Sequence, residues 1–287
     1  MAFAAVTVAE ALDSAVVAIG AAHSTTPRLD AEVLLAWSMD TSRTALFLDP
    51  RAPVTGPAVR RFQDAVRRRS SGREPVAYIV GTKGFRRLDL DVDPRVLVPR
   101  PETEHLVEAA LALVDGWPGP TRVVDVGTGS GAVALALKDE RPDLDVLAVD
   151  ASDDALAVAR ANAARLGLDV AFAAGDLLDA VPDDGRPLDL VVANLPYVPD
   201  GDRLRLAPEI RHHEPALALF GGEDGLDLVR VLVTQAAARG ARAVALEVGQ
   251  GQPPATADLL RAAGFTAGVQ VHPDLAGIDR VVLACRA

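Results

Sequence analysis

The sequence has 287 residues, with 29 basic and 40 acidic side chains and a net charge of −11. Its length fits one large domain or two ordinary ones, and its 49% hydrophobic and 24% charged residues are typical of a folded protein. The negative charge argues against a protein held to nucleic acid by a field over its whole surface. Cys285 is the single cysteine of the sequence, which excludes an internal disulfide and a multi-cysteine zinc site.

The beginning of the chain predicts a helix and not a targeting segment. Residues 1–22 are rich in alanine, but Glu10 and Asp13 interrupt them and no basic segment precedes them, so a signal peptide is not expected. No run of about 20 apolar residues occurs, so we expect no membrane span. The cytoplasm is therefore the expected location.

Residues 1–74 are predicted to form a helical domain. Thr7 and Glu10 have the spacing of a capping box, and apolar residues then recur on one helical face. Asp30 is predicted to cap a second helix, and a third helix is expected from about residue 56 to residue 70. Arginines crowd this third helix, which predicts either a solvated basic face or a docking face for an acidic partner.

Residues 75–98 are predicted to form a β-hairpin that links two domains. Residues 76–80 are apolar, as in a first strand. Apolar and acidic residues then alternate over residues 85–92, which is the period of a half-buried strand.

Residues 99–287 are predicted to form an α/β domain, because apolar strand-like runs alternate with helical patterns. The expected strands are residues 122–126, 146–150, 170–174, 188–193, 243–248, 266–271 and 280–284. The helices expected between them are residues 132–139, 153–166, 226–239 and 255–263. This alternation indicates a parallel sheet with helices on both faces. A short connection without a helix joins the last two strands, so they are expected to pair antiparallel.

The first of these strands ends in a glycine-rich turn, Asp125-Val-Gly-Thr-Gly-Ser-Gly131. Glycines at alternate positions let the backbone turn tightly and approach a ligand at the carboxyl edge of a sheet. Asp150 ends the next strand, 19 residues after Gly131, where a carboxylate can accept both hydroxyls of a ribose. Asp176 follows the third strand at the same edge. Together these residues predict a site for a nucleoside cofactor.

The glycine spacing and the residues after it argue against a dinucleotide and against a nucleoside triphosphate. It differs from the Gly-x-Gly-x-x-Gly of a dinucleotide site, and no Walker lysine follows it. A cationic sulfonium also suits a site lined with carboxylates better than a phosphate does. The glycine motif, Asp150 and the terminal antiparallel pair resemble the class I S-adenosylmethionine-dependent methyltransferases.

This resemblance implies a fold, a cofactor and its binding residues. The fold is Rossmann-like, with a mostly parallel seven-stranded sheet whose last strand is antiparallel, and the cofactor is S-adenosyl-L-methionine. The residues that it implies for cofactor binding are Asp125, Gly127, Thr128, Gly129, Ser130, Gly131, Asp150, Asp176, Leu177 and Asn194.

The fourth strand ends in Asn194-Leu195-Pro196-Tyr197, which resembles the Asn-Pro-Pro-Tyr motif of methyltransferases that modify amide or exocyclic amino nitrogens. An amide nitrogen is a poor nucleophile because its lone pair is delocalised. The side-chain oxygen of Asn194 and the carbonyl of Leu195 are expected to accept both N–H hydrogens and aim the lone pair at the methyl group. Tyr197 is expected to stack on the planar group, and Pro196 to stiffen the turn.

Leu195 departs from that motif, which has proline at this position. A leucine carbonyl can accept the same hydrogen bond as a proline carbonyl. However, ribosomal RNA adenine dimethyltransferases also carry Asn-Leu-Pro-Tyr, so the motif alone leaves the substrate open.

Outside the motif, the sequence resembles the HemK/PrmC protein-(glutamine-N5) methyltransferases. The resemblance rests on residues 74–81, on Gly84-Phe85, on residues 92–104, which end in Pro-Arg-Pro-Glu-Thr-Glu, and on residues 214–226. Glu247 and Gln250 also match family positions, without a role that the sequence explains. Family members methylate the glutamine of the Gly-Gly-Gln loop of peptide chain release factors, and a sister branch methylates a glutamine of a large-subunit ribosomal protein. The resemblance implies a release factor as the substrate, recognised by residues 1–74.

Two other functions stay open beside these. Leu195 favours a nucleic-acid adenine-N6 methyltransferase, although no stable nucleic-acid binding is expected, and the arginine-rich helix would suit a noncatalytic binding protein. His212 and His213, followed by Glu214, are not expected to bind a metal, because methyl transfer needs none and adjacent histidines in a strand or turn point in different directions.

Overall fold

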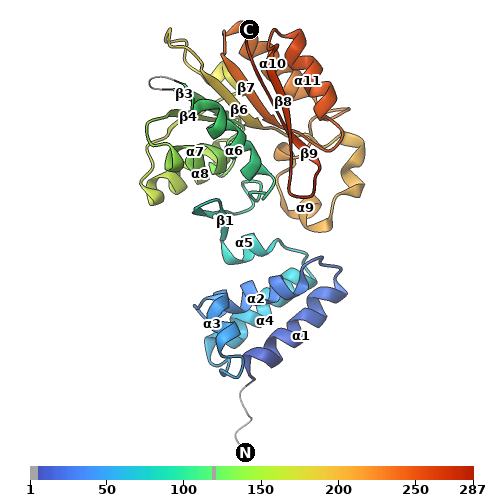
Figure 1. Cartoon of the computed structure of the whole chain (residues 1–287). Helices are drawn as coiled ribbons and strands as arrows, with labels where there is room; N and C mark the ends of the chain where they lie inside the picture. Colours follow the sequence, from blue (N-terminus) through green and yellow to red (C-terminus); the bar gives the residue numbers. More distant parts are fainter. Residues whose placement is uncertain (1–5, 118–120) are drawn as a thin grey trace, which may run out of the picture. The chain divides into compact units, whose positions relative to one another are not determined.

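The computed structural model describes residues 6–117 and 121–287, which divide into two compact units (Figure 1). The first unit runs as far as Thr82 and also contains Ala207–His213. The second unit comprises Lys83–Leu206 and Glu214–Ala287. No helix in the described ranges is long and apolar enough to cross a membrane.

The first unit is built from helices. They are α1 (Val8–Ala21), α2 (Pro27–Ser38), α3 (Arg43–Leu48), α4 (Pro57–Ser70), α5 (Val76–Val80) and α9 (Pro208–His213). The predicted capping box begins α1: the N–H of Glu10 donates to the Thr7 hydroxyl, and the N–H of Thr7 donates to the Glu10 carboxylate. The apolar faces of α1, α2 and α4 enclose a core around Leu34 and Leu35.

Asp30 does not cap α2, so that prediction is wrong. Thr26 occupies the cap position and Pro27 begins the helix, because the φ angle of proline is already helical and its missing N–H needs no partner there. Asp30 lies one turn further on and is buried, where it accepts hydrogen bonds from Arg69 at 2.7 Å and from Ser24 at 2.8 Å.

The arginines of α4, and Arg73 just after it, are largely occupied by acidic residues of their own unit. The pairs are Arg61 with Asp40, Arg67 with Asp64, Arg68 with Glu74, Arg69 with Asp30, and Arg73 with Glu209. These contacts leave a less positive surface than the sequence suggested, which weakens the idea of a docking face for an acidic partner.

The hairpin is shorter than predicted, because residues 76–80 form the helix α5 and not a strand. Pro75 precedes this helix, and Gly81 ends it with a φ of 81°. Tertiary contacts with α2 and α4 bury Ile79 and override its preference for a strand. The two strands that do pair are β1 (Thr82–Phe85) and β2 (Leu88–Asp91).

The second unit is built on a seven-stranded sheet of order β5-β4-β3-β6-β7-β9-β8. Its strands are β3 (Arg122–Val126), β4 (Asp145–Asp150), β5 (Ala171–Ala174), β6 (Leu190–Asn194), β7 (Ala243–Glu247), β8 (Ala267–Pro273) and β9 (Asp279–Cys285). Strand β9 runs antiparallel to both β7 and β8, whereas the other neighbouring pairs are parallel. The predicted class I fold with an antiparallel last strand is therefore confirmed.

Helices cover both faces of this sheet (Figure 1). They are α6 (Thr103–Val114), α7 (Ala132–Glu140), α8 (Asp153–Leu166), α10 (Asp227–Ala238) and α11 (Pro253–Ala262), with short 3₁₀ turns η1 (Leu177–Ala180), η2 (Asp200–Arg205) and η3 (Ala216–Ala218). Successive strand residues point to opposite faces: Val123 joins the core under α6 and α7, and Val124 joins the core under α10 and α11. Helix α6 was not among the helices expected from the sequence.

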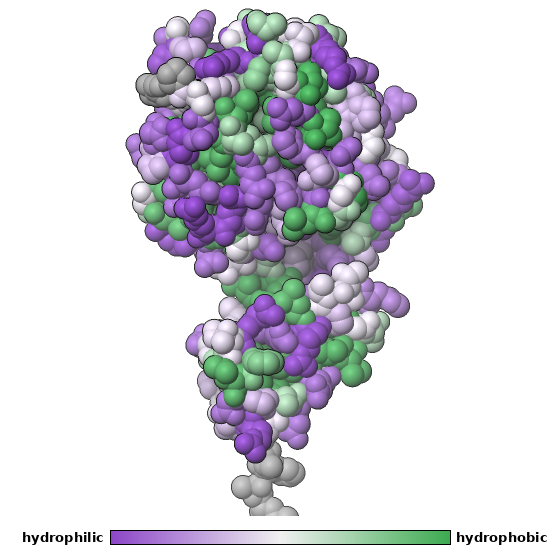
Figure 2. Space-filling view, in the orientation of Figure 1, coloured by the Kyte–Doolittle hydropathy of each residue, from purple (hydrophilic) through white to green (hydrophobic). Residues whose placement is uncertain are grey.

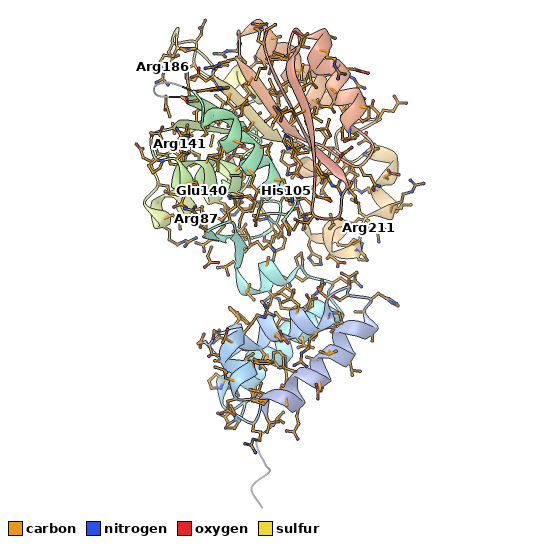
Figure 3. All side chains as sticks on the ribbon, viewed as in Figure 1. Arg87, His105, Glu140, Arg141, Arg186 and Arg211 are labelled. Atoms are coloured by element: carbon orange, nitrogen blue, oxygen red, sulfur yellow. The ribbon has the colours of Figure 1, made fainter. Side chains whose placement is uncertain are left out.

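The outer surface of the second unit carries many charged side chains. In Figure 2 the visible face is a mixture of hydrophilic and hydrophobic residues. Glu140, at the end of α7, accepts a hydrogen bond from Arg86 at 3.0 Å and lies 3.8 Å from Arg87 (Figure 3). The contacts of Arg86 and Arg87 with Glu140 tie the turn between β1 and β2 to α7.

Candidate active site

A cavity of about 210 Å³ opens at the carboxyl ends of β3, β4 and β6. It lies at the edge where the predicted site residues were expected to meet. The predicted residues that line it are Asp125, Gly127, Thr128, Gly129, Ser130, Asp150, Asp176, Leu177, Asn194, Leu195 and Pro196. Gly131 and Tyr197 belong to the same two loops but are not part of its lining.

The glycine loop takes a conformation that suits its glycines. Gly129 has a φ of 56°, and a Cβ built on it would stand in open space, so this backbone is exposed to a ligand. Gly131 has a φ of 86°, and a Cβ there would lie 2.9 Å from the side chain of Leu135 and 3.3 Å from that of Ala159. Gly129 therefore serves close approach to a ligand, and Gly131 serves close packing of the loop on α7 and α8.

The buried side chain of Asp125 stabilises the glycine loop. Its carboxylate accepts hydrogen bonds from the Thr128 hydroxyl at 2.6 Å and from the Ala134 N–H at 3.1 Å. The side chain is only 1% exposed, and burial raises the pKa of Asp125 to about 7. These contacts tie the end of β3 to the glycine loop and to the first turn of α7, which indicates a role in shaping the loop.

Asp150 links the glycine loop to the next strand. One of its carboxylate oxygens accepts the N–H of Gly129 at 2.8 Å, and the other accepts the N–H of Ser152 at 2.9 Å. A carboxylate oxygen has more than one lone pair, so these bonds leave acceptor capacity for the hydroxyls of a ligand. Asp176 precedes η1 at the same edge, and Leu177 after it has a φ of 47° and is buried.

Asn194 is the last residue of β6, and its amide has a defined orientation. Its Nδ2 donates to the hydroxyl of Thr103, at the beginning of α6, at 3.0 Å. Because the nitrogen is engaged there, the Oδ1 atom remains as the acceptor of this side chain. Thr103 lines the cavity as Asn194 does.

Leu195 directs its side chain into the protein core. It is 4% exposed and belongs to the apolar core on the α10 and α11 face of the sheet. Leucine at this position thus adds packing under the glycine loop, which a proline ring would supply only in part.

The backbone of Pro196 and Tyr197 packs tightly against the loop 221–225. A Cβ on Gly221 would lie 2.2 Å from the carbonyl oxygen of Pro196, and one on Gly225 would lie 2.1 Å from that of Tyr197. Gln252 reinforces the contact, because its Nε2 donates to the Tyr197 carbonyl at 3.0 Å. The loop 221–225 and Gln252 therefore hold the tetrapeptide Asn194-Leu195-Pro196-Tyr197 in place.

Sequence reasoning missed two of these contributors. Thr103 lies inside the Pro-Arg-Pro-Glu-Thr-Glu stretch, which was noted as a family resemblance only. Gln252 makes the contacts to the tetrapeptide, whereas Gln250, the residue singled out from the sequence, is exposed. The same stretch contains Arg100, which pairs with the buried Glu214 at 2.6 Å.

Glu247 stands opposite Asn194, as its register partner at the carboxyl end of β7. It is 2% exposed, and its Oε2 has no hydrogen-bond partner among the described residues. Burial raises the pKa of Glu247 to about 7, while hydrogen bonds from Thr103 and Asn194 lower it in part.

His212 and His213 lie at the end of α9, in a helix and not in the strand or turn that the sequence analysis assumed. The ring of His213 lies 2.8 Å from the carbonyl of Gly72. In residues 6–117 and 121–287, no three His, Cys, Asp or Glu side chains are grouped as metal ligands would be.

Comparisons with known proteins identify both parts of the chain. Residues 10–81 match the family model of the PrmC N-terminal domain, and residues 123–213 match that of a methyltransferase domain. In solved structures, the hMettl16 catalytic domain in complex with the MAT2A 3′UTR hairpin 6 has a similar fold. It has 15% sequence identity and a TM-score of 0.57 over 80% of this chain and 82% of that chain.

Relatives with much higher sequence identity also occur. The release factor glutamine methyltransferase of Koribacter versatilis is 41% identical over 96% of this chain and 98% of its own length. The protein of the same name from Moorella thermoacetica is 43% identical over 98% of this chain and 99% of its own. With such similarity along almost its whole length, the chain belongs to the family of release factor glutamine methyltransferases.

Proposed function

We propose that this protein transfers a methyl group from S-adenosyl-L-methionine to the side-chain amide nitrogen of a glutamine in a peptide chain release factor. The observation that carries this proposal is Asn194, whose amide nitrogen is bonded to Thr103 and whose oxygen is thereby left to a substrate beside the cavity. The names of the relatives agree with it.

The residues around the cavity suit this cofactor. Asp150 has acceptor capacity for ribose hydroxyls, the open backbone at Gly129 permits close approach, and Asp176 and Leu177 complete the lining. S-adenosylmethionine supplies an electrophilic methyl group on a positively charged sulfur. Three carboxylates line the cavity, and the two arginines of its lining, Arg95 and Arg100, are each paired with an acidic residue outside the lining. This balance of charge favours a cationic ligand over a phosphate.

The substrate amide is oriented by acceptors of the tetrapeptide. Asn194 Oδ1 and the Leu195 carbonyl accept the two N–H hydrogens of the glutamine side chain, which turns its nitrogen lone pair toward the methyl group. The same two dipoles would stabilise the positive charge that grows on nitrogen as the N–C bond forms and the bond between the methyl carbon and the cofactor sulfur breaks; one N–H proton is then lost to water. Tyr197 packs on the planar amide. No side-chain base strong enough to deprotonate an amide is required.

This proposal assigns a role to each part of the chain. Residues 1–74 recognise the release factor, residues 75–98 form the linker, and residues 99–287 carry out methyl transfer. We place the reaction in the cytoplasm, where translation takes place. RNA is not a substrate in this proposal.

Mass spectrometry of a release factor tests the proposal. The protein is incubated with a purified release factor and S-adenosylmethionine carrying a labelled methyl group, and parallel reactions contain ribosomal RNA or large-subunit ribosomal proteins. We expect one labelled methyl group on the glutamine of the Gly-Gly-Gln peptide, and none with Asn194→Ala under the same conditions. Label on adenine, or on a ribosomal protein alone, would contradict the proposal.

A further inference from the structure

The orientation of the Asn194 amide matters for the proposed reaction. The two ends of an asparagine amide have nearly the same shape, but the oxygen accepts hydrogen bonds and the nitrogen donates them. A substrate amide that presents N–H groups needs the oxygen. Some part of the structure must therefore distinguish the two orientations.

Thr103 is the first residue that does so. Its hydroxyl oxygen accepts a hydrogen bond from Asn194 Nδ2 at 3.0 Å. The hydroxyl proton of Thr103 is then free to be donated further, because a hydroxyl carries one donor and two acceptor sites. The side chain is 4% exposed, so water does not readily compete for that proton.

Glu247 supplies the acceptor for that proton. Hydrogen bonding from Thr103, and to a smaller extent from Asn194 itself, lowers the pKa of the Glu247 carboxylate, and the register of the sheet places Glu247 directly opposite Asn194. Glu247 does not line the cavity, so it is not a candidate for contact with the cofactor or the substrate. Its influence on the reaction must pass through its neighbours.

We propose that Thr103 and Glu247 are positioning residues that hold the amide of Asn194 with its oxygen toward the substrate. The proposal rests on the function proposed above and deepens it. An ionised carboxylate can only accept hydrogen bonds, so the Thr103 hydroxyl must donate to it. The hydroxyl oxygen then accepts from Asn194 Nδ2, and the Asn194 oxygen faces the cavity.

The direction of this series of hydrogen bonds depends on the charge of Glu247. A protonated carboxyl can donate to Thr103, which allows the hydroxyl to donate to Asn194 and the amide to turn its nitrogen outward. The charged groups that face Glu247 are Glu102 beside Thr103 and Arg280 on β9, with the phenol of Tyr197 nearby. Burial and Glu102 raise the pKa of Glu247 to about 7, and Arg280 opposes them. The single-turnover rate should therefore rise with pH across neutrality.

Kinetics of matched variants test the positioning role. Thr103→Val keeps the shape but removes the hydroxyl, Thr103→Ser keeps the hydroxyl, and Glu247→Gln removes the acceptor-only group. We expect Thr103→Val and Glu247→Gln to lower the single-turnover rate about 10- to 100-fold, the size of effect seen when a residue that orients a metal ligand is replaced. Thr103→Ser should restore most of the rate, and Glu247→Gln should abolish its rise with pH. Cofactor affinity should be unchanged in all three variants.

Thr256 offers a matched control. It is another fully buried threonine, its hydroxyl has no partner among the described residues, and it does not line the cavity. Thr256→Val should keep the single-turnover rate of the unmodified protein. A full rate in both Thr103→Val and Glu247→Gln would overturn the proposal, and so would a Thr256→Val variant as slow as Thr103→Val.

A spectroscopic test does not depend on turnover. Asn162 and Asn194 are the two asparagines of the sequence, so ¹⁵N-asparagine labelling of the full chain gives two side-chain amide signals. Asn162 is buried and donates to the carbonyls of Asp91 and Ser130, which makes it an internal reference. Thr103→Val and Glu247→Gln should each shift the Asn194 signal and speed its hydrogen exchange at least tenfold, and leave Asn162 unchanged.

The two tests separate this inference from the proposed function. If the unmodified protein methylates the release factor but an unchanged Asn194 signal accompanies full rates in the variants, the inference is wrong and the function stands. If no glutamine is methylated while the Asn194 signal changes as described, the function is wrong and the positioning of Asn194 stands.

Discussion

The backbone N–H of Gly129 donates to the carboxylate of Asp150 at 2.8 Å. The acid that ends β4 thus holds the loop that follows β3, and does so from the wall of the same cavity. Asp150 consequently has two tasks in the proposed site, which are to shape the glycine loop and to accept the hydroxyls of the cofactor.

Replacement of Asp150 should therefore weaken cofactor binding. Asp150→Ala removes a charged acceptor, and we expect a loss of about 1.5–3 kcal/mol in the binding free energy of S-adenosylmethionine. Calorimetry of the full chain measures this value. Asp153→Ala is the matched control, because Asp153 is exposed three residues further along and does not line the cavity. Equal affinities for both variants would remove Asp150 from the binding site.

Asn194 should govern the chemical step and not cofactor binding. Asn194→Ala removes one preorganised acceptor, and we expect the single-turnover rate to fall about a hundredfold or more. The affinity for S-adenosylmethionine should change little, because Oδ1 is assigned to the substrate. Rapid-quench kinetics with saturating cofactor separate the two effects. A near-normal rate in this variant would refute the amide-orienting mechanism and leave the cofactor site in place.

Leu195 should matter for stability more than for turnover. Leu195→Pro keeps the carbonyl that accepts the substrate N–H but removes most of a buried side chain, so the free energy of unfolding should fall by roughly 2–4 kcal/mol. Leu195→Met conserves volume and should lose less than about 1.5 kcal/mol. Denaturant titrations measure both values, and single-turnover rates should stay within a few-fold of the unmodified protein. A proline variant that is stable but inactive would show that the leucine side chain itself takes part in catalysis.

Gly225 should be needed for the position of Tyr197. A Cβ at this residue would lie 2.1 Å from the Tyr197 carbonyl oxygen and 2.5 Å from Gln252 Nε2, so Gly225→Ala must displace the tetrapeptide. We expect at least a tenfold loss of turnover. Gly264→Ala is the control, because Gly264 also has a positive φ, 93°, but open space around it. Similar turnover in the two alanine variants would contradict this role.

Stability should depend on pH through Asp125. Its pKa is raised from 3.8 to about 7 by burial, so between these values the folded state binds more protons than the unfolded state. The free energy of unfolding contributed by this group therefore falls as the pH rises from about 4 to 7, by an amount on the order of a few kcal/mol. Asp125→Asn cannot titrate and should flatten this part of the profile. Urea titrations across the pH range measure the slope; an unchanged slope in the variant would assign it to other groups.

Local chemistry in the sequence determined the strands, several helices and the two motifs at their ends. Periodicity decides which residues of a strand or helix are buried, and alternating strands and helices leave few topologies other than a parallel sheet. The same order places Asp125, Asp150 and Asn194 at one edge, because the carboxyl ends of parallel strands meet there. These features depend on neighbours within a few residues, so the sequence is sufficient to predict them.

Only the tertiary structure decided how the motifs are supported. Residues 76–80 have a strand-like composition but form a helix, because contacts with distant helices outweigh a weak local preference. Thr103 meets Asn194 across 91 residues of sequence, and Gln252 meets Tyr197 across 55. Glu247 stands opposite Asn194 because of the register between β6 and β7. A hydrogen bond between such residues depends on the packing of whole elements to within a fraction of an ångström, and no local pattern of residues carries that information.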